Sequence, residues 1–128
     1  MVDAERPHEV VAIGLNERSK YTAEPKAKLK NFKPRLNSST GAWELSSFSV
    51  DQLESEAVWD LLDRNLNKPA LGKAELETAV VVELAKLKAD PDWDPERHVN
   101  VVGWPQSEEE VTSAAQVLFA KQACALRD

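Results

Sequence analysis

The sequence predicts an α+β fold, a small mixed or antiparallel sheet of about 4–5 short strands packed by two main helices. Short β-branched runs lie between turn residues, and two longer segments, about 51–65 and 107–126, each carry one apolar stripe at helical spacing. A helix with a single apolar stripe needs a second layer to cover, and a sheet face supplies that layer. Strands and helices do not alternate regularly along the chain, so a doubly wound parallel fold is not expected.

The overall composition is that of an ordinary globular protein. The chain has 128 residues, of which 42% are hydrophobic and 30% charged, and it can build a core without a metal or a disulfide. We predict a single α+β domain over 9–128 behind a flexible N-terminus at 1–8. No continuous apolar run approaches the ~18 residues of a membrane span, and the start lacks the apolar core of a secretory signal. With Cys124 as the single cysteine, a cytoplasmic protein that does not bind membranes is expected.

The first half of the chain contains two predicted strands and the first helix. The predicted strands are residues 9–15, EVVAIGL, and 43–50, WELSSFSV, which are rich in β-branched or aromatic residues. Between them, NSSTG at 37–41 consists of residue types that favour a turn. For the helix at 51–65, Asp51 and Glu54 have capping-box spacing, and Ser55 is a rival cap.

The second half is ambiguous at one place and clear at the other. Residues 73–88 fit either a strand or a helix, and a strand near 73–78 followed by a short helix near 79–86 is the preferred interpretation. Two Asp-Pro steps make 90–97 a loop. A strand at 98–105 then leads to the helix at 107–126, which opens with the capping box of Ser107 and Glu110.

One segment of the chain is basic, although the net charge of the whole chain is negative. The net charge is −6, but residues 18–35 contain seven basic residues and one acid, which is +6 and leaves −12 for the remainder. Cationic side chains interleaved with aromatic rings could bind a polyanion or single-stranded nucleic acid by charge attraction and by stacking. The candidate polyanion-binding residues are Lys26, Lys28, Lys30, Phe32, Lys33 and Arg35. The favoured alternatives are a solvated loop, a lysine-protected edge strand, or a segment folded over the protein's own acidic surface, because the negative net charge of the chain disfavours nucleic acid.

The strand HVNVVGWP carries the candidate ligand site. Period-2 alternation places Val99 and Val101 toward the core and His98, Asn100 and Trp104 together on the other face. A histidine can transfer a proton near neutral pH and an asparagine can orient a polar ligand. The candidate ligand-binding residues are His98, Asn100, Trp104 and Arg35, the last as an anion clamp. The competing interpretation is that these side chains lie on the solvent-exposed face of an antiparallel strand and bind no ligand.

Named catalytic and metal motifs are absent from the sequence. There is no G-x-G-x-x-G, Walker A loop, G-x-S-x-G, H-E-x-x-H or cysteine pair, and the acidic loop at 90–96 lacks the glycine and glutamate of a calcium loop. We therefore expect no cofactor, no metal and no identifiable catalytic residue, and a small non-catalytic protein-interaction or ligand-binding module. The first alternative function is an enzyme or small-molecule binder that uses His98 and Asn100. The second alternative is binding of a nucleic acid or another polyanion through residues 18–35. The expected partner is another protein or a second copy, as in a homodimer.

Overall fold

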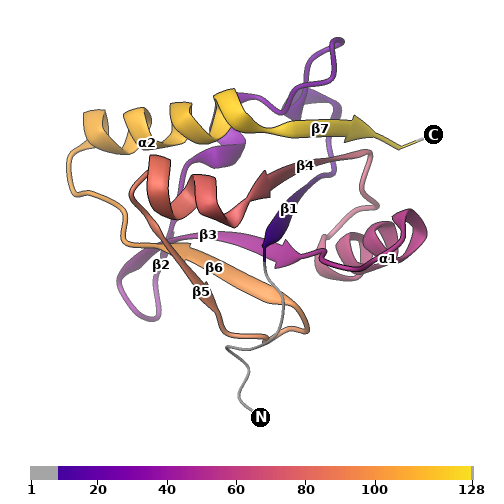
Figure 1. The fold of residues 1–128 in the computed structure, drawn as a ribbon, viewed down its shortest axis with the longest axis horizontal. Coiled ribbons are helices and arrows are strands. Elements are labelled where there is room, and N and C mark those ends of the chain that lie inside the picture. Colours follow the sequence, from indigo (N-terminus) through magenta and orange to yellow (C-terminus); the bar gives the residue numbers. More distant parts are fainter. Residues whose placement is uncertain (1–8, 128) are drawn as a thin grey trace.

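The computed structural model describes residues 9–127 and shows an α+β fold around an antiparallel sheet (Figure 1). Within these residues the sheet has seven strands, more than the four to five expected. The strands are β1 Val10–Leu15, β2 Arg35–Asn37, β3 Ala42–Ser49, β4 Gly72–Glu77, β5 Lys88–Pro91, β6 His98–Val102 and β7 Ala123–Leu126. Their order is β5-β6-β3-β1-β4-β7, and β2 pairs with β3. The N-terminus predicted to be flexible, 1–8, lies outside the described residues.

Two α-helices and three shorter turns complete the described chain. They are α1 Ser55–Asn65, α2 Glu108–Lys121, the 3-10 turns η2 Arg18–Lys20 and η3 Leu29–Phe32, and the π-helical turn η4 Val80–Leu84. The split of 73–88 into a strand and a short helix is confirmed by β4 and η4. The predicted cap Ser107 is also confirmed, because its hydroxyl accepts a hydrogen bond from the Glu110 N–H at 3.2 Å.

The first helix begins later than the capping-box spacing predicts. Asp51 does not cap α1, which starts at Ser55 with Glu54 as its N-cap residue. Instead the Asp51 carboxylate accepts hydrogen bonds from the N–H groups of Glu9 and Val10, both at 2.8 Å. A carboxylate can accept from any nearby pair of free donors, and here the start of β1 supplies them.

The C-terminal helix ends five residues earlier than predicted. After Lys121 the chain becomes extended at Gln122 and forms β7, which pairs with β4 from Gly72↔Leu126 to Glu75↔Ala123. Ala125, which falls within the predicted helix, therefore lies in a strand. Strand β4 would otherwise present a row of unpaired N–H and C=O groups, and pairing them with β7 outweighs continuing the helix.

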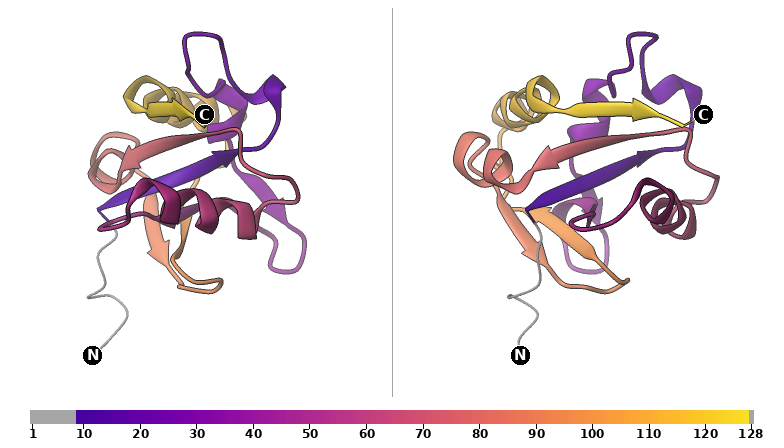
Figure 2. Two further views of the ribbon diagram at one scale, coloured as in Figure 1. Left: turned by 90° about the vertical axis from the view of Figure 1, so that its right-hand side faces the viewer. Right: turned by 45° about the vertical axis from the view of Figure 1, so that its right-hand side comes forward.

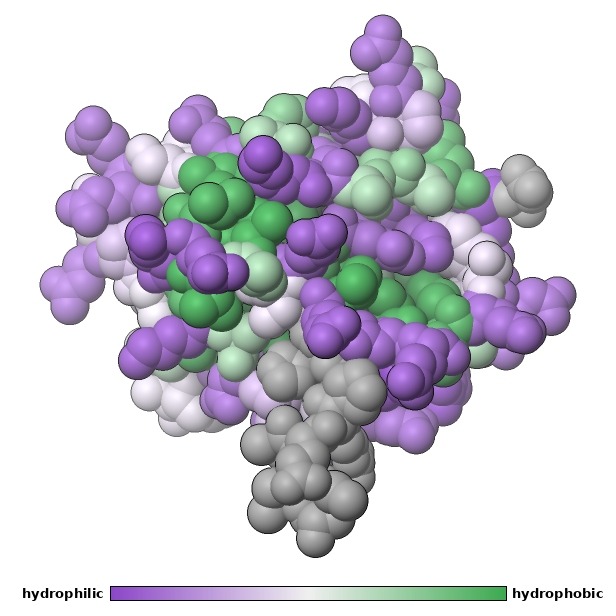
Figure 3. Space-filling model, viewed as in Figure 1, coloured by the Kyte–Doolittle hydropathy of each residue, from purple (hydrophilic) through white to green (hydrophobic). Residues whose placement is uncertain are grey.

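Each face of the sheet is covered by a different hydrophobic cluster, with α2, η3 and η4 on one side and α1 on the other (Figure 2). Strand β3 contributes to both, because Leu45 packs in the first cluster and Phe48 in the second. Two buried faces explain why hydrophobic residues stand at both parities of β3 without a bulge. On the side viewed in Figure 1, hydrophilic side chains separate the apolar areas (Figure 3).

The basic segment is folded into the first cluster. Tyr21 and Ala27 form an isolated β-bridge, and Phe32 at the end of η3 is fully buried with its ring edge against Phe119, 6.4 Å between ring centroids. The segment is therefore not a solvated loop, and the buried ring of Phe32 has no exposed face on which a base could stack. The packed segment instead fixes where its lysine side chains emerge.

The position of η3 is linked to a gap beside β3. Strand β1 pairs with β3 only at Val11↔Ser49 and Ala12↔Phe48, and β2 pairs with β3 only from Ala42 to Glu44. On this side of β3, residues 45–47 therefore lie between the two partner strands. A cavity opens at this gap.

Candidate functional site

A cavity of about 340 Å³ opens where β1 and β3 separate. Gly14 and Ser46 lie on the two diverging strands, Lys20, Lys30 and Asn31 come from the basic segment, and other walls come from β2 and the end of α1. The walls are held by the buried parts of the fold, because η3 is anchored by Phe32 and β2 by its pairing with β3. The cavity walls are thus anchored in the core and in the sheet.

The charge of this cavity is strongly unbalanced. Its cationic lining residues in the described chain are Lys20, Lys30, Lys33 and Arg35, against the single carboxylate Glu44. That carboxylate accepts a hydrogen bond from Asn37 Nδ2 at 3.1 Å, and no ion pair joins any of the four cations to an acid within residues 9–127. Four unpaired cations around one opening make it a site of positive potential.

The surroundings of Lys20 in this cavity alter its pKa. Its ammonium donates a hydrogen bond to Asn16 Oδ1 at 2.7 Å, and Asn16 Nδ2 donates to Asn67 Oδ1 at 2.7 Å. Burial lowers the pKa of Lys20 below its usual value, Glu17 opposes this shift, and the charges of Arg35, Lys30 and Lys68 add to the lowering. A negative charge placed in the cavity would favour the charged form of Lys20.

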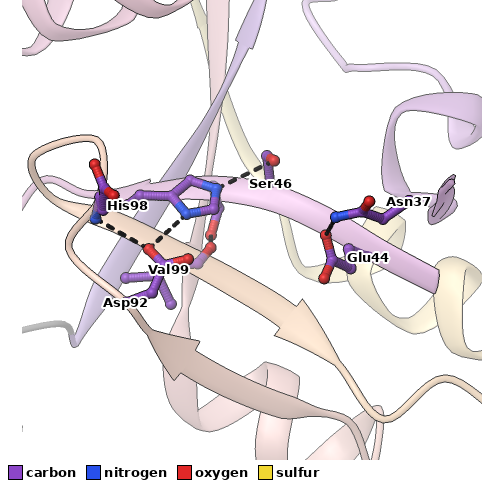
Figure 4. A network of polar contacts seen from close by, with 8 residues as sticks. Asn37, Glu44, Ser46, Asp92, His98 and Val99 are labelled. Carbon is purple, nitrogen blue, oxygen red and sulfur yellow. Dashed lines mark hydrogen bonds and ion pairs between the residues drawn. The ribbon is translucent and has the colours of Figure 1, made fainter. Parts of the chain in front are cut away.

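A histidine network lies beside the cavity, on β3 and β6 (Figure 4). His98 is buried, with 9% of its surface exposed, and Phe48 packs against its ring at 5.3 Å between centroids. Its Nδ1 lies 2.7 Å from Asp92 Oδ1, and its Nε2 lies 3.1 Å from Ser46 Oγ. The imidazole therefore bridges a carboxylate and a hydroxyl.

The loop after β5 positions Asp92 for this contact. Trp93 N–H donates to His98 O at 3.0 Å, His98 N–H donates to Pro95 O at 2.9 Å, and Asp94 N–H donates to Asp92 Oδ1 at 3.1 Å. Trp93 and Arg97 have φ of 55° and 69°. Each such left-handed residue other than glycine costs about 1–2 kcal/mol, so the surrounding contacts must hold the loop in this form.

Asn100 is the direct neighbour of Ser46 across the β3–β6 pair. Its Oδ1 is buried without a hydrogen-bond partner, the one side-chain atom of which this is true in the part of the chain that the structure describes. Unsatisfied buried acceptors are rare in folded proteins.

The structure places three of the four candidate ligand-binding residues on one sheet face, although only Arg35 of the three lines the cavity. Arg35 is paired with Glu44, Ser46 follows two positions along β3, and Asn100 is paired with Ser46, so Arg35, Asn100 and His98 share one sheet face. Trp104 does not, because Gly103 with φ of 79° turns the chain and the indole packs against the core cluster that contains Val99 and Val101. The predicted shared face is wrong for Trp104.

The candidate polyanion residues divide into two groups. Lys30, Lys33 and Arg35 line the cavity, whereas Lys26 lies over the Phe119 ring at 5.6 Å and the exposed Lys28 is outside the lining. Sequence reasoning missed Lys20, Ser46 and Asp92 as site residues. Asp92 could have been noted as a carboxylate one loop from His98, but no periodicity places Ser46 beside the imidazole.

Comparison with protein-family models, with curated proteins and with solved structures finds no match. Among the residues described, no helix is long and apolar enough to span a bilayer.

Proposed function

We propose that this protein binds a small anionic molecule, one that carries a carboxylate or phosphate group, in the cavity between β1 and β3. The observation that carries the proposal is the set of four unpaired cations around about 340 Å³ of space. Ligand pockets of small molecules typically have volumes of this order, about 300–1,000 Å³.

The chemistry of the lining suits a small anion better than a nucleic-acid strand. Arg35 offers a planar fork of donors that matches carboxylate and phosphate oxygens, and the lysines add point charges. The aromatic residues of the basic segment, Tyr21 and Phe32, are buried and cannot stack on bases. Because the whole chain has a charge of −6, the positive cavity is also a local attractor on an acidic protein.

Thermal unfolding in the presence of inorganic phosphate and of citrate tests the proposal. A ligand at 100 times its Kd adds about 2.7 kcal/mol of stability, on the order of 10 °C in Tm for a chain of this size. We expect such a shift at constant ionic strength adjusted with chloride. The double variant Lys30→Glu/Lys33→Glu should abolish it.

The matched control is Lys26→Glu/Lys28→Glu, which makes the same charge change in the same segment outside the cavity. It should keep the shift. Equal loss in both variants, or no shift in the parent protein with either anion, would contradict a specific cavity. Binding of a labelled oligonucleotide that both variants weaken equally would instead favour the polyanion interpretation of the whole segment.

A further inference from the structure

We propose that Ser46, His98 and Asp92 form a nucleophilic relay that hydrolyses carboxylic esters whose acyl group carries a negative charge. The choice of an anionic acyl group rests on the proposed function, and the relay itself rests on separate residues. It is carried by the linear arrangement of the Asp92 carboxylate, the His98 imidazole and the Ser46 hydroxyl, at 2.7 and 3.1 Å (Figure 4).

The order of the three groups fixes their roles. An ionised carboxylate only accepts hydrogen bonds, so beside an ionised Asp92 a neutral His98 imidazole carries its proton on Nδ1 and presents the lone pair of Nε2. That lone pair faces the Ser46 hydroxyl, which is the arrangement needed to activate a serine. Asp92 is a positioning residue, since it acts through the imidazole.

Ser46 is placed where a substrate could reach it. It is exposed, whereas the next serine along β3, Ser47, is buried and donates to Val99 O at 2.7 Å. Ser46 also lines the basic cavity, so an anion held by Arg35 and the lysines would lie next to its hydroxyl. Ser46 thus combines an exposed hydroxyl, a neighbouring imidazole base and a positively charged cavity. An ordinary surface hydrogen bond between a serine and a histidine would not need this combination.

A backbone donor could stabilise the developing oxyanion. Val50 N–H donates to Val10 O on β1 and Ser49 N–H donates to Arg97 O on the other side, so alternation directs the Ser46 N–H to the side of β1, where the cavity lies. Such a donor acts on the charge that appears only in the transition state.

The reaction balances without a further reagent except water. Ser46 Oγ bonds to the acyl carbon while its proton passes to His98 Nε2, and collapse of the tetrahedral intermediate breaks the carbon–oxygen bond of the ester. His98 returns that proton to the leaving alkoxide, which departs as an alcohol. Water then attacks the acyl-Ser46 ester by the same route, giving the carboxylic acid and restoring the serine.

Covalent labelling tests the relay independently of anion binding. A neutral alkyl fluorophosphonate should modify the full-length protein at one site, identified as Ser46 by peptide mass spectrometry. Ser46→Ala should remove labelling, and Asp92→Asn should slow it at least 10-fold. Ser38→Ala, an exposed serine of the β2–β3 turn, should label at the parent rate. No modification at Ser46 would overturn the relay.

Ester hydrolysis tests the substrate class. We expect 4-nitrophenyl hemisuccinate to be cleaved with a higher kcat/KM than 4-nitrophenyl butyrate, and Ser46→Ala to reduce both by on the order of 10³-fold. Asp92→Asn should lower kcat with little change in KM, which a role limited to holding the loop would not do. His98→Gln should behave like Ser46→Ala if circular dichroism shows that it is folded.

The outcomes separate this inference from the proposed function. Lys30→Glu/Lys33→Glu should raise KM for the hemisuccinate at least 10-fold and thereby remove the preference for the hemisuccinate over the butyrate. If labelling and hydrolysis occur without preference for the anionic ester, the relay stands and anion recognition is refuted. If phosphate or citrate binds in the cavity while Ser46 is inert, the binding function stands and the relay is refuted.

Discussion

Replacing Phe32 with alanine tests whether the basic segment is packed as the structure shows. The side chain is fully buried and packs edge-on against Phe119. Removing a buried phenylalanine ring costs about 3–5 kcal/mol of unfolding free energy, within which the ring–ring geometry contributes about 0.5–1.5 kcal/mol. This is a large part of the total stability of a typical domain, about 5–15 kcal/mol.

Urea denaturation followed by tryptophan fluorescence measures this loss. With an m-value of about 2 kcal/mol/M, a loss of about 4 kcal/mol lowers the midpoint by about 2 M. Phe32→Leu keeps most of the volume and should cost about 1 kcal/mol, which remains measurable if the alanine variant does not fold. Lys28→Ala on the exposed side of the same segment should change stability by less than about 0.5 kcal/mol.

A Phe32→Ala loss no larger than that of Lys28→Ala would refute the packing of η3. The wall that presents Lys20 and Lys30 to the cavity would then not be fixed, and the anion-binding proposal would lose its basis. The same experiment thus checks the fold and the site together.

Three further predictions use the polar contacts. Gln122→Ala should cost about 2–4 kcal/mol in urea denaturation, because Gln122 accepts from Ala27 N–H at 2.7 Å and donates to the Ala27 carbonyl at 2.9 Å, leaving two buried groups unpaired; a loss below about 0.5 kcal/mol would contradict this role. Asp51→Ala should cost about 1–2 kcal/mol and increase hydrogen exchange of the Val10 amide, whereas unchanged exchange would argue against the contact. The Ala70 N–H and then Arg127 lower the pKa of Asp63, so its stabilisation is present above its unfolded pKa and is lost as pH falls through the lower folded pKa. Asp63→Asn should therefore be less stable than the parent at pH 7 and match it in strong acid, and a constant difference in Tm across this range would refute the linkage.

Much of the fold follows from local patterns. The caps, stripes and alternation that predicted the elements act between residues close in sequence, so β1, β3, β6, η4 and the start of α2 are visible in the chain itself. The errors concern elements whose form depends on a distant partner. Asp51 binds the start of β1 instead of capping α1, and residues 123–126 leave the helix because the β4 edge accepts them.

The candidate site was only partly accessible to sequence reasoning. His98, Asn100, Lys30, Lys33 and Arg35 were identified by residue type and spacing, and the structure places all five at or beside the gap in the sheet. Ser46 was not identified, because its relation to His98 is set by strand register across 52 residues of chain. Burial of Phe32 was likewise hidden, since a phenylalanine between lysines has no local signature of its environment.

The amino-acid sequence by itself determined the α+β class, the apolar faces of both helices and the inward direction of Val99 and Val101. These features depend on periodicity and capping, which act over one or two turns of chain. Only the tertiary structure decided that β1 and β3 separate, that η3 packs beside the gap and that Asp92, His98 and Ser46 meet there. Strand pairing and packing contacts form between segments that are distant in sequence. There, hydrogen bonding of strand-edge N–H and C=O groups and burial of apolar side chains outweigh the local secondary-structure propensity.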